Sequence, residues 1–305
     1  MPIAMHADQI DVPAELVRRL LEEQFPEFAT LPLEEVDSTG TVNALFRLGP
    51  ALLVRLPLTP RGNDGVRHEH AWLPWFAGRL PVRVPDLRGA GEPSLGYPCP
   101  WSVLEWLDGS VPDADDLSDP DGLAADLGEL VTAIRRLDPT GAPPAYRGDP
   151  IRNADVDVRA ALAEIAADPV LRQEVDVGAV TAAWDEVLAV PDWSAEPVWV
   201  HSDLLPGNLL VADGRLVGVL DLAESGLGDP ACDAMIAWSL LPAGGREVFR
   251  AAAGFDDATW ARGRGWALSG GLGGVRYYRR TNPAMADLAR RQLRAVLADH
   301  AAASH

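Results

Sequence analysis

Three side chains between residues 199 and 233 carry the oxygen atoms that phosphate chemistry needs: Asp203, Asn208 and Asp221. Asn208 follows Asp203 by five positions, and Asp221 follows after thirteen more. A carboxylate can accept the proton of a hydroxyl, while an amide oxygen and a second carboxylate can hold Mg²⁺ against the phosphates of ATP. This order and spacing therefore indicate phosphoryl transfer.

The motifs around these residues resemble those of a known family. The run His201-Ser202-Asp203 with Asn208 resembles the HGDxxxxN catalytic loop of aminoglycoside phosphotransferases and related small-molecule kinases. Asp221 resembles the metal-binding aspartate of that family, and Gly228-Asp229-Pro230-x-x-Asp233 resembles its GDPxxD signature. The resemblance implies that Asp203 orients or deprotonates the acceptor hydroxyl and that Asn208 and Asp221 bind Mg²⁺. Ser202 stands where the family usually has glycine, a small-for-small change that should be tolerated.

The remaining polar residues of these motifs are expected to be structural. His201 should hydrogen-bond the backbone and hold the turn. Of Asp229 and Asp233, one should brace the catalytic loop and the other should cap the helix that starts near Ala231.

Composition excludes several enzyme classes. The 305 residues include no lysine, so all 26 strongly basic side chains are arginine. A Walker A phosphate loop and a lysine Schiff base are therefore ruled out. Two cysteines at unrelated positions indicate neither a disulfide framework nor a metal site. No long apolar run or signal-like segment is seen, which predicts a soluble, cytoplasmic protein without membrane contact.

The formal net charge of −19 argues against nucleic-acid binding, which needs a basic surface. The charge is uneven, since residues 105–305 carry 32 acidic and 17 basic side chains. An acidic second half would attract a cationic substrate. A merely solvated acidic surface remains the alternative explanation, and no protein partner is evident.

The first hundred residues predict a helix and a strand meander. Helical spacing of apolar residues indicates a helix over Ala14–Gln24, after which Val36–Arg47 reads as strand, turn and strand. By resemblance to a kinase N-lobe, the turn would cover the nucleotide phosphates, and Ser38 in it is a candidate phosphate-binding residue. The next strand, Ala51–Leu56, carries Arg55 where a kinase has its phosphate-binding lysine. Glu69, in a helix beginning near Asn63, resembles the ion-pair partner of that lysine.

A further strand, which resembles the last strand of a kinase N-lobe, leads into an expected hinge. The segment from Gly96 to Gly109 reads as a strand that ends at Asp108-Gly109. By resemblance, the adenine of ATP would bond to the backbone carbonyl of Glu105 and the backbone N–H of Leu107.

The second half predicts mostly helices. The expected helices are Leu123–Ile134, Arg159–Ala167, Val177–Val190, Met235–Leu241, Arg246–Ala253, Ala258–Ser269 and Pro283–Asp299. Gly270–Gly274 follows a helix and contains four glycines, so we expect it to break that helix and to have no nucleotide role.

Together these features predict an α+β, bilobal protein-kinase-like fold. Its expected parts are a sheet-rich N-lobe over residues 1–104, a hinge over 105–110 and a helical C-lobe over 111–305. The implied activity is transfer of the γ-phosphoryl group of ATP, with GTP not excluded, to a hydroxyl of a small cationic acceptor such as an aminoglycoside.

Three alternatives remain open at this level. Related kinases act on amino alcohols or sugars. A non-catalytic nucleotide-binding homologue is suggested because Arg55 replaces lysine and Ser202 replaces glycine. A metal-dependent phosphohydrolase would use Asp203, Asp221 and Asp229.

Overall fold

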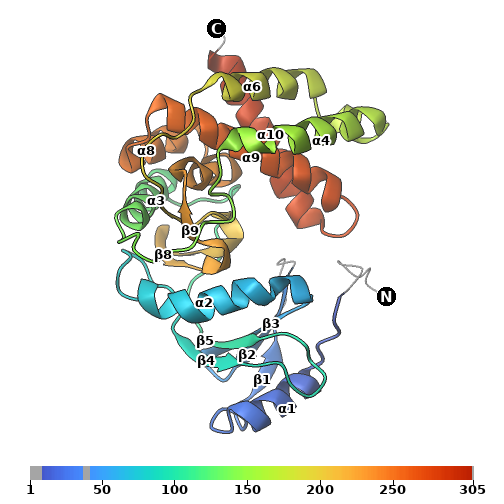
Figure 1. Cartoon of the computed structure of the whole chain (residues 1–305), viewed down its shortest axis with the longest axis vertical. Helices are drawn as coiled ribbons and strands as arrows, with labels where there is room; N and C mark the ends of the chain where they lie inside the picture. The colour runs from blue at the N-terminus through green and yellow to red at the C-terminus, as the bar shows by residue number, and fades with distance from the viewer. Residues whose placement is uncertain (1–8, 37–41, 304–305) are drawn as a thin grey trace. The chain divides into compact units, whose positions relative to one another are not determined.

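The computed structural model describes residues 9–36 and 42–303 of the chain. Packing divides the protein into two compact units (Figure 1). The N-terminal unit consists of Met1–Ser110 and Val217–Ala223, and the C-terminal unit consists of Val111–Leu216 and Glu224–His305. The short segment Val217–Ala223 therefore packs with the N-terminal unit although it lies far along the chain.

The N-terminal unit is built on a five-stranded antiparallel sheet with the strand order β1-β2-β3-β5-β4. Its strands are β1 (Leu33–Glu35), β2 (Asn43–Leu48), β3 (Leu52–Pro57), β4 (Leu87–Gly91) and β5 (Trp101–Glu105). Two helices accompany the sheet, α1 (Ala14–Gln24) and α2 (Asn63–Phe76), and Figure 1 shows them on opposite sides of it.

Strand alternation positions Arg55. Helix α1 has the bounds that its apolar spacing predicts, and it buries Val17 and Leu20 against one face of the sheet. Val54 and Leu56 of β3 enter the same core. Because successive side chains of a strand point to opposite faces, Arg55 lies on the other face, on the side of α2.

The segment Val217–Ala223 is joined to the N-terminal unit by backbone hydrogen bonds. The N–H of Arg83 donates to the carbonyl of Val217 at 3.1 Å, and the N–H of Val219 donates to the carbonyl of Arg83 at 2.9 Å. These bonds hold the end of β8 (Arg215–Val219), and Asp221 follows two positions after that end. The position of Asp221 is therefore set by the N-terminal unit.

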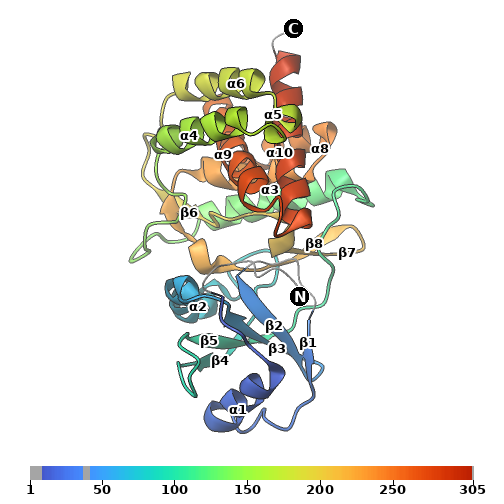
Figure 2. The ribbon, with the colours of Figure 1, turned by 90° about the vertical axis from the view of Figure 1, so that its right-hand side faces the viewer.

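The C-terminal unit is mainly helical. Its α-helices are α3 (Pro120–Arg135), α4 (Asp155–Ala167), α5 (Leu171–Glu174), α6 (Val177–Ala189), α7 (Ile236–Leu240), α8 (Ala243–Ala253), α9 (Asp257–Tyr277) and α10 (Pro283–Ala303). Helix α3 packs against α8, α9 packs against α10, and α4 lies beside α6 (Figure 2). Asp119, Asp176 and Asp256 cap the N-termini of α3, α6 and α9 by accepting backbone N–H bonds.

Short strands carry the motifs of the second half. Strand β6 (Val198–Val200) pairs antiparallel with β9 (Gly226–Gly228), and β7 (Leu209–Ala212) pairs with β8. The candidate catalytic loop, which contains His201, Ser202 and Asp203, follows β6, and the GDPxxD signature begins at the end of β9. Within the part of the chain that the structure describes, none of the helices has the length and apolar character needed to cross a bilayer.

The expected helix break at Gly270–Gly274 is wrong, because α9 continues through it to Tyr277. A β-carbon on Gly271 would lie 2.8 Å from the side chain of Leu293, and one on Gly274 would lie 2.6 Å from the β-carbon of Ala289. These glycines let α9 and α10 approach closely, so packing outweighs their low helix propensity.

Asp126 joins α3 to the start of β8 and provides a test of this arrangement. Its carboxylate accepts bonds from Arg215 Nε at 2.8 Å and from the backbone N–H of Leu216 at 3.1 Å. The bond from Arg215 lowers the pKa of Asp126 below its ordinary value of 3.8. We expect Asp126→Asn to lower the Tm at neutral pH, because the amide replaces one of these acceptor oxygens by a donor.

The loss should depend on pH. Because the pKa of Asp126 is depressed in the folded state, its stabilisation is present above the unfolded pKa and is lost as pH falls through the folded pKa. The Tm difference between wild type and Asp126→Asn should be full near pH 7 and should shrink below about pH 4. Melting curves followed by circular dichroism, with the exposed Glu247→Gln as control, measure it. A pH-independent difference would contradict the role of the charge.

Candidate active site

Four residues of the N-terminal unit form a cluster around a buried guanidinium. Arg55 and Glu69, the two residues expected to place the phosphates, form an ion pair in which both side chains are buried. Arg55 Nη1 lies 3.6 Å from Asp221 Oδ1. Glu69 Oε1 also accepts the backbone N–H of Leu222 at 3.1 Å. One carboxylate therefore links Arg55 to the backbone next to Asp221.

The guanidinium of Arg55 has N–H groups that the protein does not saturate. Its Nε is buried and has no hydrogen-bond partner among the described residues, and the 3.6 Å separation from Asp221 exceeds hydrogen-bond distance. Burial lowers the pKa of Arg55, and the charge of Asp221 opposes this shift. A buried cation with spare donors next to a carboxylate is suited to an anionic ligand that bridges it to a metal ion.

The expected hinge residues lie at the end of β5. The Glu105 side chain pairs with Arg83 at 2.8 Å, and the Glu105 backbone N–H donates to the carbonyl of Asp86 at 2.9 Å. Leu107 is buried. The assignment of these two residues to adenine rests on backbone groups and is a proposal. Ser38, the candidate phosphate-binding residue, lies outside the described residues.

In the C-terminal unit, two neighbours hold Asp203, the candidate catalytic residue. Arg147 Nη1 donates to Asp203 Oδ1 at 2.7 Å. Asn208 Nδ2 donates to the backbone carbonyl of Asp203 at 2.8 Å and lies 3.4 Å from its Oδ2. The structure thus brings Asp203 and Asn208 together in one unit and Arg55, Glu69 and Asp221 together in the other.

A buried carboxylate, that of Asp233, holds the backbone of the loop that contains Asp203. Asp233 accepts the backbone N–H groups of His201 and Ser202, each at 2.8 Å. Burial raises the pKa of Asp233, and the His201 ring and the two N–H bonds oppose this shift. His201 Nδ1 accepts the backbone N–H of Asp203 at 3.3 Å, which is the structural role expected for it. Asp233 is the aspartate that braces the loop.

Ser202 takes a backbone conformation that explains the usual glycine. Its φ is 72°, in the left-handed region, which costs a residue with a β-carbon about 1–2 kcal/mol. The fully buried hydroxyl accepts the backbone N–H of Arg147 at 2.7 Å. This bond is one that glycine cannot make, and it offsets part of the strain.

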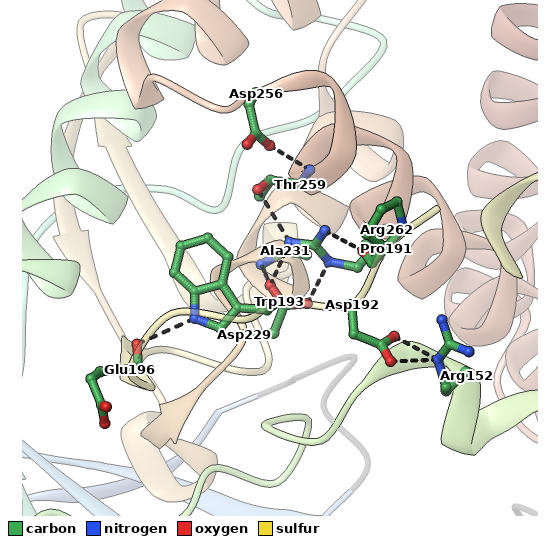
Figure 3. A network of polar contacts seen from close by, with 10 residues as sticks. All are labelled: Arg152, Pro191, Asp192, Trp193, Glu196, Asp229, Ala231, Asp256, Thr259 and Arg262. Atoms are coloured by element: carbon green, nitrogen blue, oxygen red, sulfur yellow. Dashed lines mark hydrogen bonds and ion pairs between the residues drawn. The ribbon is translucent and has the colours of Figure 1, made fainter. Parts of the chain in front are cut away.

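Asp229 of the GDPxxD signature is committed to a buried ion pair (Figure 3). Arg262 Nε donates to Asp229 Oδ2 at 2.6 Å, and both side chains are 3% exposed. Asp229 Oδ1 also accepts the backbone N–H of Ala231 at 3.0 Å and so caps the short 3₁₀ helix Pro230–Met235. With both oxygens occupied, Asp229 is unsuited to the three-carboxylate metal centre of a phosphohydrolase.

Arg147 contacts Asp203, and no sequence pattern predicts that contact. It precedes Asp203 by 56 positions, in a Pro/Gly-rich loop. No motif or periodicity marks it, and the only available signal is a basic residue in a segment that otherwise reads as a turn.

Asn208 and Asp221 each offer an oxygen of a kind that binds Mg²⁺. Asn208 uses its amide nitrogen to hold Asp203, so the amide oxygen is the end that can bind a cation. Asp221 is partly exposed and is held in a left-handed conformation with φ 56°. Carboxylate and amide oxygens are ligands that Mg²⁺ accepts.

The ion pair in Figure 3 generates a stability prediction. Arg262→Met should lower the free energy of unfolding by about 3–5 kcal/mol, because it leaves the Asp229 carboxylate buried without its partner. Arg152→Met removes the exposed pair with Asp192 in the same view and should change it by less than about 1 kcal/mol. Urea denaturation measures both variants, and equal effects would contradict the assignment.

Comparison with solved structures shows the same fold. Wild-type aminoglycoside 2'-phosphotransferase-IIIa in its GDP complex superposes with a TM-score of 0.69 at 19% identity, over 93% of this chain and 98% of that one. The gentamicin complex of APH(2")-IIa gives 0.65 at 14%, over 94% and 99%. Macrolide 2'-phosphotransferase MphH from Brachybacterium faecium gives 0.60 at 22%, over 92% and 97%. The expected kinase-like α+β fold is confirmed.

Comparison with sequences identifies the family. No curated protein matches the chain. The model of the phosphotransferase enzyme family matches residues 36–266, a span that includes Arg55, the catalytic loop and the GDPxxD signature. The chain therefore belongs to the phosphotransferase enzyme family and has the kinase-like fold of small-molecule phosphotransferases.

Proposed function

We propose that the protein transfers the γ-phosphoryl group of ATP to a hydroxyl of a small molecule, with Asp203 orienting and deprotonating that hydroxyl. The observation that carries the proposal is the catalytic loop, in which Arg147 and Asn208 orient Asp203. This loop lies within the residues that match the family. GTP is the alternative donor, because aminoglycoside 2'-phosphotransferase-IIIa was solved with GDP.

In the proposed step, the acceptor oxygen forms a bond to the γ-phosphorus while the bond from that phosphorus to the β–γ bridging oxygen breaks. The hydroxyl proton goes to the Asp203 carboxylate, and the nucleoside diphosphate leaves. Asn208 and Asp221 would hold Mg²⁺, which when bound supplies positive charge next to the phosphate oxygens.

The Arg55 cluster would place the donor. The Nη1 end of the Arg55 guanidinium, next to Asp221, would contact phosphate oxygens, and Glu69 keeps the guanidinium in place. The backbone carbonyl of Glu105 and the backbone N–H of Leu107 would bond to the adenine.

The acceptor that we favour is a cationic small molecule such as an aminoglycoside. The acidic excess of residues 105–305 supports it, since opposite charge raises the encounter rate. Gentamicin is bound in the APH(2")-IIa structure. The macrolide 2'-phosphotransferase MphH has the same fold, so macrolides belong in the acceptor panel with amino alcohols and sugars.

The two departures that suggested a non-catalytic homologue both have partners in the structure. Arg55 pairs with Glu69, and the Ser202 hydroxyl is hydrogen-bonded. These contacts support an active enzyme.

The first test is acceptor-dependent nucleotide consumption. Wild type should convert ATP or GTP in the presence of Mg²⁺ and one acceptor class, and Asp203→Ala should lower kcat by about 10²–10⁴-fold while nucleotide binding is kept. Asp287→Ala, an exposed carboxylate on α10, is the matched control and should behave as wild type. Coupled assays give the rates, and calorimetry gives nucleotide affinity with and without Mg²⁺.

The outcomes separate the alternatives. Nucleotide binding without acceptor-dependent turnover would favour the non-catalytic homologue. Metal binding without nucleotide binding would favour a phosphohydrolase. Turnover of Asp203→Ala at the wild-type rate would reject Asp203 as the base.

A second test addresses Arg55. Arg55→Lys keeps the charge but has a single ammonium in place of the guanidinium fork, so we expect the nucleotide Kd to rise about tenfold. Arg67→Lys, an exposed residue of α2, is the control and should leave the Kd unchanged. Calorimetry with Mg²⁺ and nucleotide measures both variants. An unchanged Kd for Arg55→Lys would show that the fork is not used.

A further inference from the structure

Arg147 connects the catalytic aspartate to a distant segment of the C-terminal unit. Its Nη1 lies 2.7 Å from Asp203 Oδ1 and 2.7 Å from the backbone carbonyl of Ser202. Its own backbone N–H donates to Ser202 Oγ at 2.7 Å. Both the side chain and the backbone of Arg147 therefore form hydrogen bonds with the catalytic loop.

The segment that carries Arg147 is held in place by β9. The N–H of Leu227 donates to the carbonyl of Pro143 at 2.8 Å, and the N–H of Ala145 donates to the carbonyl of Leu227 at 3.0 Å. A β-carbon on Gly228 would lie 2.3 Å from the α-carbon of Gly148, so the segment and the strand are in backbone contact. The Arg147 side chain therefore projects from a segment that backbone hydrogen bonds hold against β9.

The guanidinium also packs on an aromatic ring. The Cζ of Arg147 lies 4.9 Å from the ring centroid of Tyr146. This cation–π contact further restricts the conformations of the Arg147 side chain. The Arg147 side chain is 23% exposed, so water screens its contact with Asp203 only in part.

The two carboxylate oxygens of Asp203 are consequently unlike. Oδ1 receives the short bond from Arg147, whereas the nearest donor to Oδ2 is Asn208 Nδ2 at 3.4 Å. Oδ2 therefore has more of its lone pairs free to accept a hydrogen bond.

We propose that Arg147 is the positioning residue of Asp203 and that Ser202 anchors Arg147. The inference rests on the proposed phosphotransfer. Arg147 holds Oδ1 so that Oδ2 faces the acceptor hydroxyl. As the acceptor oxygen bonds to the γ-phosphorus and the bond to the nucleoside diphosphate breaks, the hydroxyl proton moves to Oδ2. Ser202, which stands where the family usually has glycine, then takes part in positioning Asp203. Its hydroxyl accepts the backbone N–H of Arg147, and glycine has no side-chain acceptor for this bond.

The first experiment compares Arg147→Met, Arg147→Lys and Arg147→Ala with wild type. Arg147→Met should lower kcat by about 10–100-fold, because a small displacement of a reacting group is costly, while acceptor KM and nucleotide Kd change less than about threefold. Arg147→Lys should recover part of kcat. Arg152→Met, which breaks a surface pair on the neighbouring 3₁₀ helix Ile151–Ala154, is the control.

Chemical rescue separates positioning from a general loss of structure. Added methylguanidinium should restore part of kcat in Arg147→Ala and none in Asp203→Ala. Rescue of neither variant, with unchanged melting temperatures, would overturn the positioning role.

Two variants test the anchor. Ser202→Ala loses the Oγ bond and keeps the left-handed strain, whereas Ser202→Gly loses both the bond and the strain. We expect the same loss of kcat in both and a higher Tm for Ser202→Gly than for Ser202→Ala. A wild-type kcat in both variants would show that Ser202 does not anchor Arg147 for catalysis.

The readouts keep the two proposals apart. If wild type turns over, Asp203→Ala does not and Arg147→Met matches wild type, the positioning role fails and the phosphotransfer stands. If wild type turns over no acceptor, the proposed function fails. Crystal structures of Arg147→Met and Arg147→Lys then decide the positioning role without activity. We expect a changed Asp203 rotamer in Arg147→Met, and an unchanged rotamer would overturn the inference.

Discussion

The candidate catalytic loop depends on one buried carboxylate that accepts two consecutive backbone N–H groups. Asp233 holds His201 and Ser202 in this way, and the turn that results needs a left-handed residue at Ser202. A carboxylate in the core is costly unless it is hydrogen-bonded, so the burial that raises its pKa also makes both bonds obligatory. This turn therefore determines the direction in which the side chain of Asp203 projects from the loop.

Glu69 has a comparable role in the N-terminal unit. Its carboxylate pairs with Arg55 and accepts the backbone N–H of Leu222, directly after Asp221. Asp221 is itself in a left-handed conformation. In both units a buried acid therefore holds a strained backbone next to a candidate functional carboxylate. Charge-assisted hydrogen bonds suit this purpose because they are short and directional.

Because the sequence has no lysine, the cationic side chains in these contacts are arginines, and each can hold several acceptors. A guanidinium has five donors in a fixed plane, so one side chain can hold several acceptors at defined angles. Arg147 binds a carbonyl and a carboxylate through a single nitrogen, and Arg262 binds Asp229, Thr259 and the carbonyl of Pro191. A lysine at either position could satisfy fewer of these acceptors in one geometry. The supporting contacts of the site are accordingly multidentate.

Some features of this protein follow from the sequence by itself. The apolar spacing of Ala14–Gln24 determines a helix with those bounds, because helical periodicity is a local property. The motifs around Asp203 and Asp229 resemble those of the family, and that resemblance predicts the kinase-like fold that the solved structures confirm. The Mg²⁺-binding roles of Asn208 and Asp221 stay predictions, which rest on their spacing and on the family resemblance.

Only the tertiary structure decided the rest, because it depends on contacts between distant segments. Gly270–Gly274 predicts a helix break from local propensity, but packing of α9 on α10 keeps the helix continuous. The sequence left open which of Asp229 and Asp233 braces the loop, and the fold assigns that role to Asp233. Arg147 reaches Asp203 only after its segment has paired with β9, and no local pattern encodes a contact across 56 positions.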